Sequence, residues 1–324
     1  MPDPWNMLEL LKEKIAAAGG PVSCHAHFDK AYVITPEKLQ MCNDHMEVKW
    51  DLWKEVKENY THEDLVERIS RSAETMIAQG CDTTRTNIDV DSTVGMKCID
   101  AALEVKEKYK DKIDIQIFSQ VLEGALTPEA QKFIAEAAEK VDGLGALPSR
   151  DRPHEEEHLK FIFDLARKQN KTVDVHIDQN NDPEERDTEL LARAVIRHGM
   201  QGRVNAVHAC SLAAQPDEYI REVAALIKEA DMSVIVCPRA MIDNQQPREK
   251  VGPTHNSVAP VPHLIEAGVN VCLGVDNVHD FFCPFIDGDI FSELVFLLEA
   301  TRLYDVQTLV DIATKNGRTV LENR

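Results

Sequence analysis

Long apolar runs are missing from this chain: none approaches the ~20 residues that a membrane-spanning helix needs, and no signal peptide opens the sequence. Cys-x-x-Cys pairs are missing too, although the chain has 8 cysteines, most of them inside apolar runs. We therefore expect buried thiols in a reducing cytoplasm and no disulfide framework.

Positive charge is scarce, since 36 Lys and Arg face 56 Asp and Glu and leave a formal net charge of −20. A nucleic-acid duplex or an anionic membrane surface would repel such a field, so neither is expected as a partner. The hydrophobic fraction of 43% and the charged fraction of 28% are ordinary for a folded protein. They exclude a disordered or fibrous chain and leave a globular protein with a large core.

Short runs rich in Val, Ile and Cys alternate with amphipathic helical patterns along the chain, which is typical of βα units around a parallel sheet. Eight units over about 250 residues or more is the count of a TIM barrel. A doubly wound open sheet would show a glycine-rich phosphate turn after a strand, and we find none. The predicted fold is therefore α/β, a (β/α)8 TIM barrel. The eight runs lie at residues 21–28, 81–90, 113–120, 141–148, 172–178, 204–211, 233–238 and 269–277.

The predicted organisation is simple. Residues 1–20 contain a short amphipathic helix, and residues 21–324 form the barrel as a single domain. Two long segments interrupt the alternation of strands and helices. We expect residues 29–61 to form a lid or an inserted helix pair and residues 239–256 to form a polar loop, since long loops in compact domains are usually functional or mobile.

Polar side chains recur where the runs end, which in a TIM barrel is the catalytic face. His25 and His27 stand one residue apart, so on a strand both imidazoles point the same way. His176 and Asp276 end the fifth and eighth runs and can reach the same point in the barrel mouth. Three neutral imidazoles and one carboxylate, with positions open for water, are typical of a catalytic divalent-metal site.

The order of these motifs along the chain is highly specific: His25-Ala-His27-Phe28-Asp29-Lys30, Asp174-Val175-His176, Val207-His208 and Gly274-Val275-Asp276. Over residues 20–320 it resembles the amidohydrolase superfamily, closest to its cytosine deaminase and N-isopropylammelide amidohydrolase branch. The resemblance implies one divalent ion per chain, zinc or iron, with four metal ligands: His25, His27, His176 and Asp276.

The same resemblance implies a hydrolase that cleaves a non-peptide C–N bond of a small nitrogen heterocycle, by deamination, dealkylamination or opening of a cyclic amide. Bound metal lowers the pKa of water toward about 7, which makes a nucleophile available at neutral pH. Asp276 would accept the proton of that water, and His208 would stabilise the charge that develops on the substrate. Gln120 would hold the substrate ring.

The chain departs from its branch three residues after the third metal histidine, where Gln179 stands in place of a glutamate that moves a proton. Asp178 points the same way as His176 if the strand continues, so it is the first candidate for the proton shuttle. Lys30 is the second, because burial can lower the pKa of an ammonium. The other interpretations are a turn residue or helix cap for Asp178 and a solvated loop lysine for Lys30.

Three further residues are expected to contact the substrate. Gln179 can orient a substrate group although it carries no proton. Arg239 follows a predicted strand at the mouth and would attract anionic or carbonyl-rich substrates, unless it forms a rim ion pair. Asp280 lies in the loop after the last strand, where the branch places substrate contacts.

Two alternatives remain open at this stage. The first is a pseudoenzyme or ligand-binding barrel that keeps the metal but has lost proton transfer through Gln179. The second keeps the metal and opens a cyclic imide. Members of the branch usually carry a small β-sandwich, but only 24 residues precede His25 and about 10 follow the last predicted helix, 306–315. We therefore expect a barrel without the sandwich, alone or as a homodimer.

Overall fold

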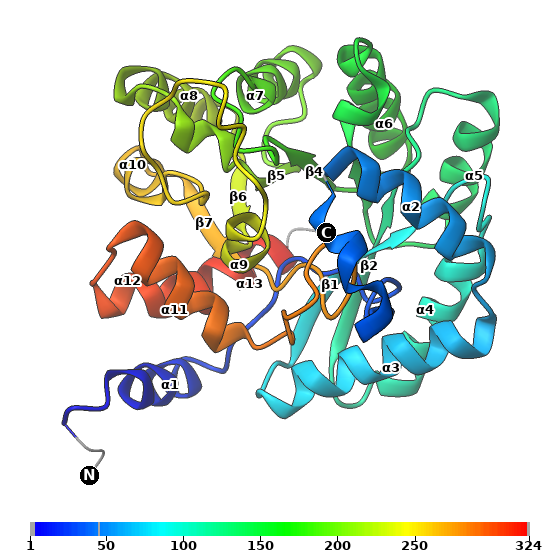
Figure 1. The fold of residues 1–324 in the computed structure, drawn as a ribbon, viewed down its shortest axis with the longest axis horizontal. Coiled ribbons are helices and arrows are strands. Elements are labelled where there is room, and N and C mark those ends of the chain that lie inside the picture. The colour runs from blue at the N-terminus through cyan, green and yellow to red at the C-terminus, as the bar shows by residue number, and fades with distance from the viewer. Residues whose placement is uncertain (1–3, 45, 323–324) are drawn as a thin grey trace.

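The structure is a computed structural model that describes residues 4–44 and 46–322. The first three residues of the predicted N-terminal segment lie outside this part. Parallel strands occupy the centre of the molecule and helices surround them, with α1 (Met7–Ala17) at the periphery (Figure 1). The strands within the described residues are β1 (Thr83–Asp89), β2 (Asp114–Gln120), β3 (Leu144–Ala146), β4 (Val173–Ile177), β5 (Val204–His208), β6 (Ser233–Val236) and β7 (Asn270–Leu273).

Neighbouring strands follow chain order. Parallel ladders join β1 to β2 and run without interruption from β3 to β7. A parallel bridge between Phe118 and Gly143 connects β2 to the segment that enters β3. Nearly all strand residues are buried, because helices cover the outer face and side chains fill the interior.

The predicted first strand, residues 21–28, closes the ring without forming a regular ladder. Ser23 bridges to Thr84 of β1, and Ala26 bridges to Asp276, beyond the end of β7. The segment therefore lies between the first and last strands, where a barrel needs it. This confirms the predicted TIM-barrel fold, with the difference that one of the eight runs pairs through isolated bridges and single backbone hydrogen bonds without forming a regular strand.

The helices begin and end at expected signals. The Thr61 side chain accepts a hydrogen bond from the Asp64 N–H (3.1 Å) and caps α3, and Gly199 ends α7 in the left-handed conformation that a glycine adopts freely. The predicted last helix is α12, and α13 follows it directly. The helices after α1 are α2 (Met46–Glu58), α3 (His62–Ala78), α4 (Lys97–Tyr109), α5 (Pro128–Ala138), α6 (Glu155–Gln169), α7 (Asp187–His198), α8 (Asp217–Glu229), α9 (Pro238–Ile242), α10 (Val261–Glu266), α11 (Ile290–Thr301), α12 (Val306–Ala313) and α13 (Lys315–Glu322).

The long segment 29–61 contains the expected pair of inserted helices, a 3₁₀ helix (Pro36–Asn43) and α2. Trp53 fixes α2 to the barrel: it is fully buried and its ring centroid lies 5.3 Å from that of Phe281 and 5.9 Å from that of Phe282. The second long segment starts with the short α9 and continues without regular structure.

Arg85 ties the barrel together away from the mouth. It is fully buried, and its Nη1 lies 3.0 Å from Asp174 Oδ1. Its Nη2 donates to Gln116 Oε1 (2.9 Å) and to the Val320 carbonyl of α13 (3.0 Å). One guanidinium therefore connects β1, β2, β4 and the final helix.

The remaining composition-based expectations concern thiols and membranes. All eight cysteines are free, and all but Cys42 are buried, which confirms buried thiols without disulfides. Among the described helices, none is both long and apolar enough to cross a membrane.

Candidate active site

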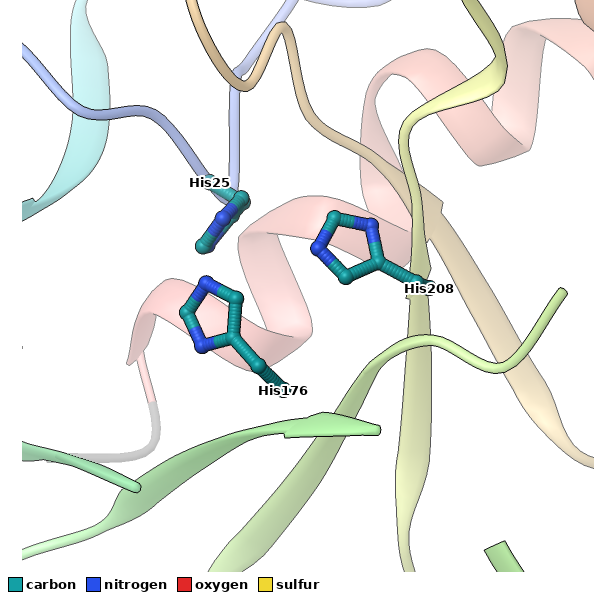
Figure 2. Close-up of side chains that lie close together, drawn as sticks. All are labelled: His25, His176 and His208. Carbon is teal, nitrogen blue, oxygen red and sulfur yellow. The ribbon is translucent and has the colours of Figure 1, made fainter. Parts of the chain in front are cut away.

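Four imidazoles and one carboxylate converge at the C-terminal end of the barrel strands. Figure 2 shows the rings of His25, His176 and His208 turned toward one another. His25 Nε2 and His27 Nε2 each lie 3.4 Å from Asp276 Oδ1. His27 Nε2 lies 3.3 Å from His176 Nε2, and His208 Nε2 lies 3.9 Å from Asp276 Oδ2. The structure thus brings together every residue predicted as a metal ligand.

The strand ends place these side chains. His176 is the next-to-last residue of β4, and His208 is the last residue of β5. His208 and Asp276 have φ values of 79° and 57°, a left-handed backbone that residues with a Cβ adopt only at a cost. Strain of this kind is concentrated at functional sites. At His208 and Asp276 the left-handed backbone changes the direction of the chain between the strand and the loop that follows it.

The spacing of the donor atoms fits one divalent ion. Two atoms bound at 2.0–2.1 Å to a tetrahedral ion lie roughly 3.3–3.4 Å apart, as the His25–Asp276, His27–Asp276 and His27–His176 atom pairs do. His25 Nε2 and Asp276 Oδ1 are buried and have no hydrogen-bond partner. The Asn87 carboxamide lies 2.8 Å from His25 Nδ1, and the Asn87 carbonyl lies 3.1 Å from His27 Nδ1. His27 Nδ1 can donate to that carbonyl, which leaves His27 Nε2 free for a metal.

Burial keeps the imidazoles neutral, which is the form that binds metal. It lowers the pKa of His25 and of His208 to about 3 each. It also lowers the pKa values of His27 and His176 well below the usual range, with Lys30 adding to the effect. A free lone pair on each ring is therefore available at neutral pH.

A cavity opens directly over the cluster and encloses about 440 Å³, its open mouth included. One part of its wall is apolar, and the rest offers amide, imidazole, ammonium and carboxylate groups. Its lining residues are His27, Lys30, Met46, Trp50, Gln120, Leu122, Leu147, His176, Gln179, His208, Ala240, Met241, Asn244, Asp276, Asn277, Phe282 and Cys283.

Both glutamines predicted to contact substrate line this cavity. Gln120 is the last residue of β2, and its Oε1 is buried without a hydrogen-bond partner. Gln179 follows β4, and its backbone carbonyl accepts a hydrogen bond from Asn244 Nδ2 (3.2 Å). A buried amide oxygen without a partner is costly, so Gln120 carries an unused acceptor in a residue that lines the cavity.

Asp178 does not line the cavity. The strand ends at Ile177, and Asp178 takes a left-handed backbone with φ of 50°. Its carboxylate accepts hydrogen bonds from the Asp187 N–H (2.9 Å) and the Thr188 hydroxyl at the start of α7. The expectation that Asp178 points the same way as His176 is therefore wrong, because the strand does not continue. Asp178 holds a helix start, and a role as proton shuttle has no support in this geometry.

Asp178 belongs to a cluster of three buried carboxylates with Glu185 and Asp187. Burial, followed by repulsion from these two neighbours, raises the pKa of Asp178 to about 8. Arg152 Nη2 lies 2.5 Å from Asp187 Oδ2 and 3.2 Å from Glu185 Oε1. The cluster thus has its own counter-charge, and it fixes the loop that carries Gln179.

Lys30 lines the cavity and is fully buried, which excludes a solvated loop lysine. Its Nζ lies 2.6 Å from Asp89 Oδ1 and 3.7 Å from Asp29 Oδ1. Burial by itself lowers the pKa of Lys30, but the two carboxylates outweigh it and leave the pKa raised. The expected drop of the Lys30 pKa is therefore wrong. Lys30 therefore stays protonated at neutral pH and acts as a cation and hydrogen-bond donor, not as a base.

Arg239 is also placed differently from the prediction, because it does not line the cavity. Its Nη1 lies 2.8 Å from Asp287 Oδ1, and its Nη2 donates to the Phe285 carbonyl (3.1 Å). Arg239 thus forms the rim ion pair that was the alternative interpretation.

Asp280 lies behind the cavity wall and does not line it, which corrects the expectation of direct substrate contact. Its Oδ1 accepts hydrogen bonds from the N–H groups of Phe282 (2.8 Å) and Cys283 (2.9 Å), and its Oδ2 accepts one from the Asn277 amide. These three partners do line the cavity. Asp280 therefore shapes the wall, and burial raises the pKa of this carboxyl to about 7.

Sequence reasoning missed a chain of buried charges behind Lys30. Lys57 of α2 is buried, and its Nζ lies 3.5 Å from Asp89 Oδ2 and 3.0 Å from Glu123 Oε1. Since Asp89 also binds Lys30, it joins the two ammonium groups. Asp89 had a detectable signal, a carboxylate at the end of the run 81–90. Lys57 had no such signal in the sequence, because a lysine on an amphipathic helix is usually a surface residue.

Comparison with known proteins shows clear relatives. Residues 116–323 match the amidohydrolase family. An uncharacterized protein of Haemophilus influenzae is 35% identical over 259 residues, 79% of this chain and 94% of that protein. N-isopropylammelide isopropyl amidohydrolase of Pseudomonas sp. (strain ADP) is 30% identical over 328 residues, 96% of this chain and 77% of that protein.

Solved structures share the fold. The crystal structure of 5-methylcytosine deaminase from Klebsiella pneumoniae liganded with 5-fluorocytosine superposes with a TM-score of 0.84 and 27% identity. The match covers 93% of this chain and 74% of that one.

Proposed function

The chain belongs to the amidohydrolase family, and from that membership we propose that it is a metal-dependent hydrolase that cleaves a C–N bond of a small nitrogen heterocycle. The observation that carries the proposal is the convergence of four neutral imidazoles and Asp276 on the floor of a cavity of about 440 Å³. Relatives named for N-isopropylammelide and for 5-methylcytosine support a heterocyclic substrate.

We assign the metal, zinc or iron, to four ligands: His25, His27, His176 and Asp276. A bound divalent ion supplies Lewis acidity and lowers the pKa of water into the neutral range. The protein contributes neutral imidazoles, which burial provides, and a floor from which bulk water is largely excluded. His208 is left outside the ligand set and faces the substrate from β5.

Asp276 is the one carboxyl group among the described residues that line the cavity. It takes a proton from the attacking water at Oδ2 and passes it to the leaving nitrogen, so no separate shuttle is needed. Burial raises the pKa of Asp276, which makes the carboxylate a better proton acceptor. His208 then donates a hydrogen bond to the substrate atom that becomes negative, a role typical of oxyanion stabilisation.

The two glutamines hold the ring. A carboxamide offers a donor and an acceptor side by side, which matches the alternating N–H and C=O groups of a cyclic amide. Gln120 has its acceptor free, and Gln179 lies in the wall of the same cavity. The Lys30 ammonium adds a fixed positive charge, which favours carbonyl-rich or anionic rings.

A release assay tests this proposal. Purified protein, loaded with zinc or iron, is incubated with a panel of aminated and N-alkylated pyrimidines and triazines, and ammonia and amines are measured. We expect turnover of at least one member and a loss of about 10²-fold or more in Asp276→Asn. A panel without turnover by either metal form would contradict the proposal.

Metal content tests the ligand assignment separately. His176→Ala should bind well under one equivalent by elemental analysis, because one of four ligands is gone. His62→Ala is the matched control, since His62 lies exposed on α3 and pairs with Glu104. A full equivalent in His176→Ala would overturn the assignment.

Gln179→Glu separates the active enzyme from the pseudoenzyme. If Gln179 recognises the substrate, the variant should lose turnover of the best panel member. If the variant instead gains activity on simple aminoheterocycles that the wild type ignores, the chain is a hydrolase degraded at its proton shuttle.

A further inference from the structure

Helix α2 carries a buried cation that the proposed mechanism does not use. Lys49 is only 4% exposed, and within the described residues its ammonium has no carboxylate at ion-pair distance and no hydrogen-bond acceptor. The other buried lysines differ, since Lys30 lies 2.6 Å from Asp89 and Lys57 lies 3.0 Å from Glu123. The side chain of Lys49 is thus largely buried, but Lys49 Nζ is not among the buried polar atoms that lack a hydrogen-bond partner, so the ammonium keeps contact with the open space beside it.

Lys49 lies on the path into the active site. It lines an outer cavity that encloses about 2150 Å³, open solvent included. This outer cavity continues from the inner one, because Met46, Gln179 and Asn244 line both. Trp50 of the same helix lines the inner cavity. Helix α2 therefore places an aromatic ring beside the heterocycle of the proposed substrate, and the Lys49 ammonium beside any substituent that extends from this heterocycle into the outer cavity.

Among the described residues, none of the charged groups around the outer cavity forms an ion pair with Lys49. Lys250 lies 2.6 Å from Asp182, and Arg152 lies 2.5 Å from Asp187, so both have counter-charges. Asp243 feels the field of Lys49 but forms no ion pair with it. The stem of Lys49 is buried while its ammonium has no ion-pair partner among the described residues, so this charge is available to a ligand of the opposite charge.

We propose that Lys49 binds an anionic substituent of the substrate, a carboxylate on or attached to the heterocycle. The inference rests on the proposed function, since the ring of that substrate occupies the inner cavity. A single carboxylate fits better than a phosphate dianion, because four carboxyl groups line the same space and would repel a second negative charge. These groups belong to Asp44, Asp182, Asp243 and Glu249. Lys49 is then a specificity residue that selects acidic heterocycles.

Matched probes test the proposal. Cytosine-5-carboxylate is compared with cytosine, and N-(2-carboxyethyl)ammelide with N-isopropylammelide, by calorimetry on the metal-loaded protein. We expect at least one carboxylated probe to bind the wild type about tenfold or more tightly than its neutral counterpart. Lys49→Met should remove this preference and leave binding of the neutral probes unchanged. Lys54→Met, an exposed position on the same helix, should keep the preference.

The outcomes separate this inference from the proposed function. Binding is measured without turnover, so a protein that hydrolyses no probe still tests Lys49. If neither carboxylated probe binds better than its neutral counterpart, or if Lys49→Met keeps the preference, the inference is overturned even when neutral heterocycles are hydrolysed. Thermal unfolding without probes adds a second readout. Lys49→Met should not lower the Tm, whereas equal losses in Lys49→Met and Asp243→Asn would reveal a structural charge pair and overturn the inference.

Discussion

At the residue scale, the neutral histidines of the active site make stability depend on pH. The pKa of His208 is about 3 in the folded protein, against an ordinary value of 6.5 in the unfolded chain. Below pH 6.5 the unfolded chain binds the extra proton. This contribution to stability is therefore complete above pH 6.5 and is lost as the pH falls toward 3.

The slope can be measured on chelator-treated protein. We expect the free energy of unfolding of the wild type to fall more steeply between pH 7 and pH 5 than that of His208→Asn. The difference should approach about 1.4 kcal/mol per pH unit below pH 6, because one buried neutral imidazole has been removed. Urea unfolding at several pH values measures it. Equal slopes would show that His208 is protonated in the folded state.

Gly274 allows the backbone to approach His25, one of the proposed metal ligands, closely. A Cβ built there would lie 2.7 Å from His25 Cβ and 2.9 Å from the His25 carbonyl oxygen, closer than real contacts. Gly274→Ala should therefore cost about 1–3 kcal/mol in unfolding free energy and lower the metal content, because His25 must move. Gly199→Ala is the control for urea unfolding: its φ of 63° adds backbone strain, but a methyl group there meets nothing within 4 Å. Unchanged metal content in Gly274→Ala would contradict this account.

Which residues converge could be predicted from the sequence, but the direction of single side chains could not. The His-x-His motif, His176, His208 and Asp276 end strands, and strand ends meet at one face of a barrel. Asp178 is the exception. The predicted run 172–178 includes it as a strand residue, but its left-handed backbone ends the strand one residue earlier, at Ile177. The two carboxylates that raise the pKa of Lys30 are partners that only the folded chain brings near.

At the element scale, α2 is held over the barrel by the buried charges around Lys57. Its ammonium binds Asp91 and lies near Asp89 and Glu123. Lys57→Met should lower the free energy of unfolding by roughly 3–5 kcal/mol, because buried carboxylates lose their shared cation. Lys54→Met, exposed on the same helix, should change it by less than about 0.5 kcal/mol. Equal effects on chemical unfolding would mean that the buried network contributes nothing.

The sequence predicted the existence of these elements better than their form. Residues 29–61 were expected to be a lid or helix pair, and the structure has a 3₁₀ helix and α2 there. Trp53 stacks on Phe282, which is far away in the sequence. The periodicity of a sequence carries no information on such long-range contacts. The pattern of residues 21–28 predicts a strand, yet the segment forms isolated bridges and single backbone hydrogen bonds to its neighbours in place of a regular ladder. The division of the chain at residue 20 and the homodimer stay predictions.

At the scale of the whole molecule, Arg85 links strands across the barrel interior to the last helix. Asp174→Ala would leave its guanidinium buried without a carboxylate partner, and breaking such a pair costs roughly 3–5 kcal/mol. We expect a single cooperative unfolding transition at lower denaturant concentration. Asp164→Ala, at an exposed pair on α6, is the control. A separate early transition would show that the barrel unfolds in parts.

The closure of the ring by residues 21–28 has a consequence for folding. This segment precedes β1 to β7 along the chain and carries His25 and His27, yet its neighbour Asp276 follows β7. Contacts between such distant parts of a chain form late and slowly, since loop closure precedes them. A polypeptide that ends before Asp276 therefore cannot complete the proposed ligand set. Closing the ring of strands and completing the proposed ligand set are therefore one and the same event for this chain.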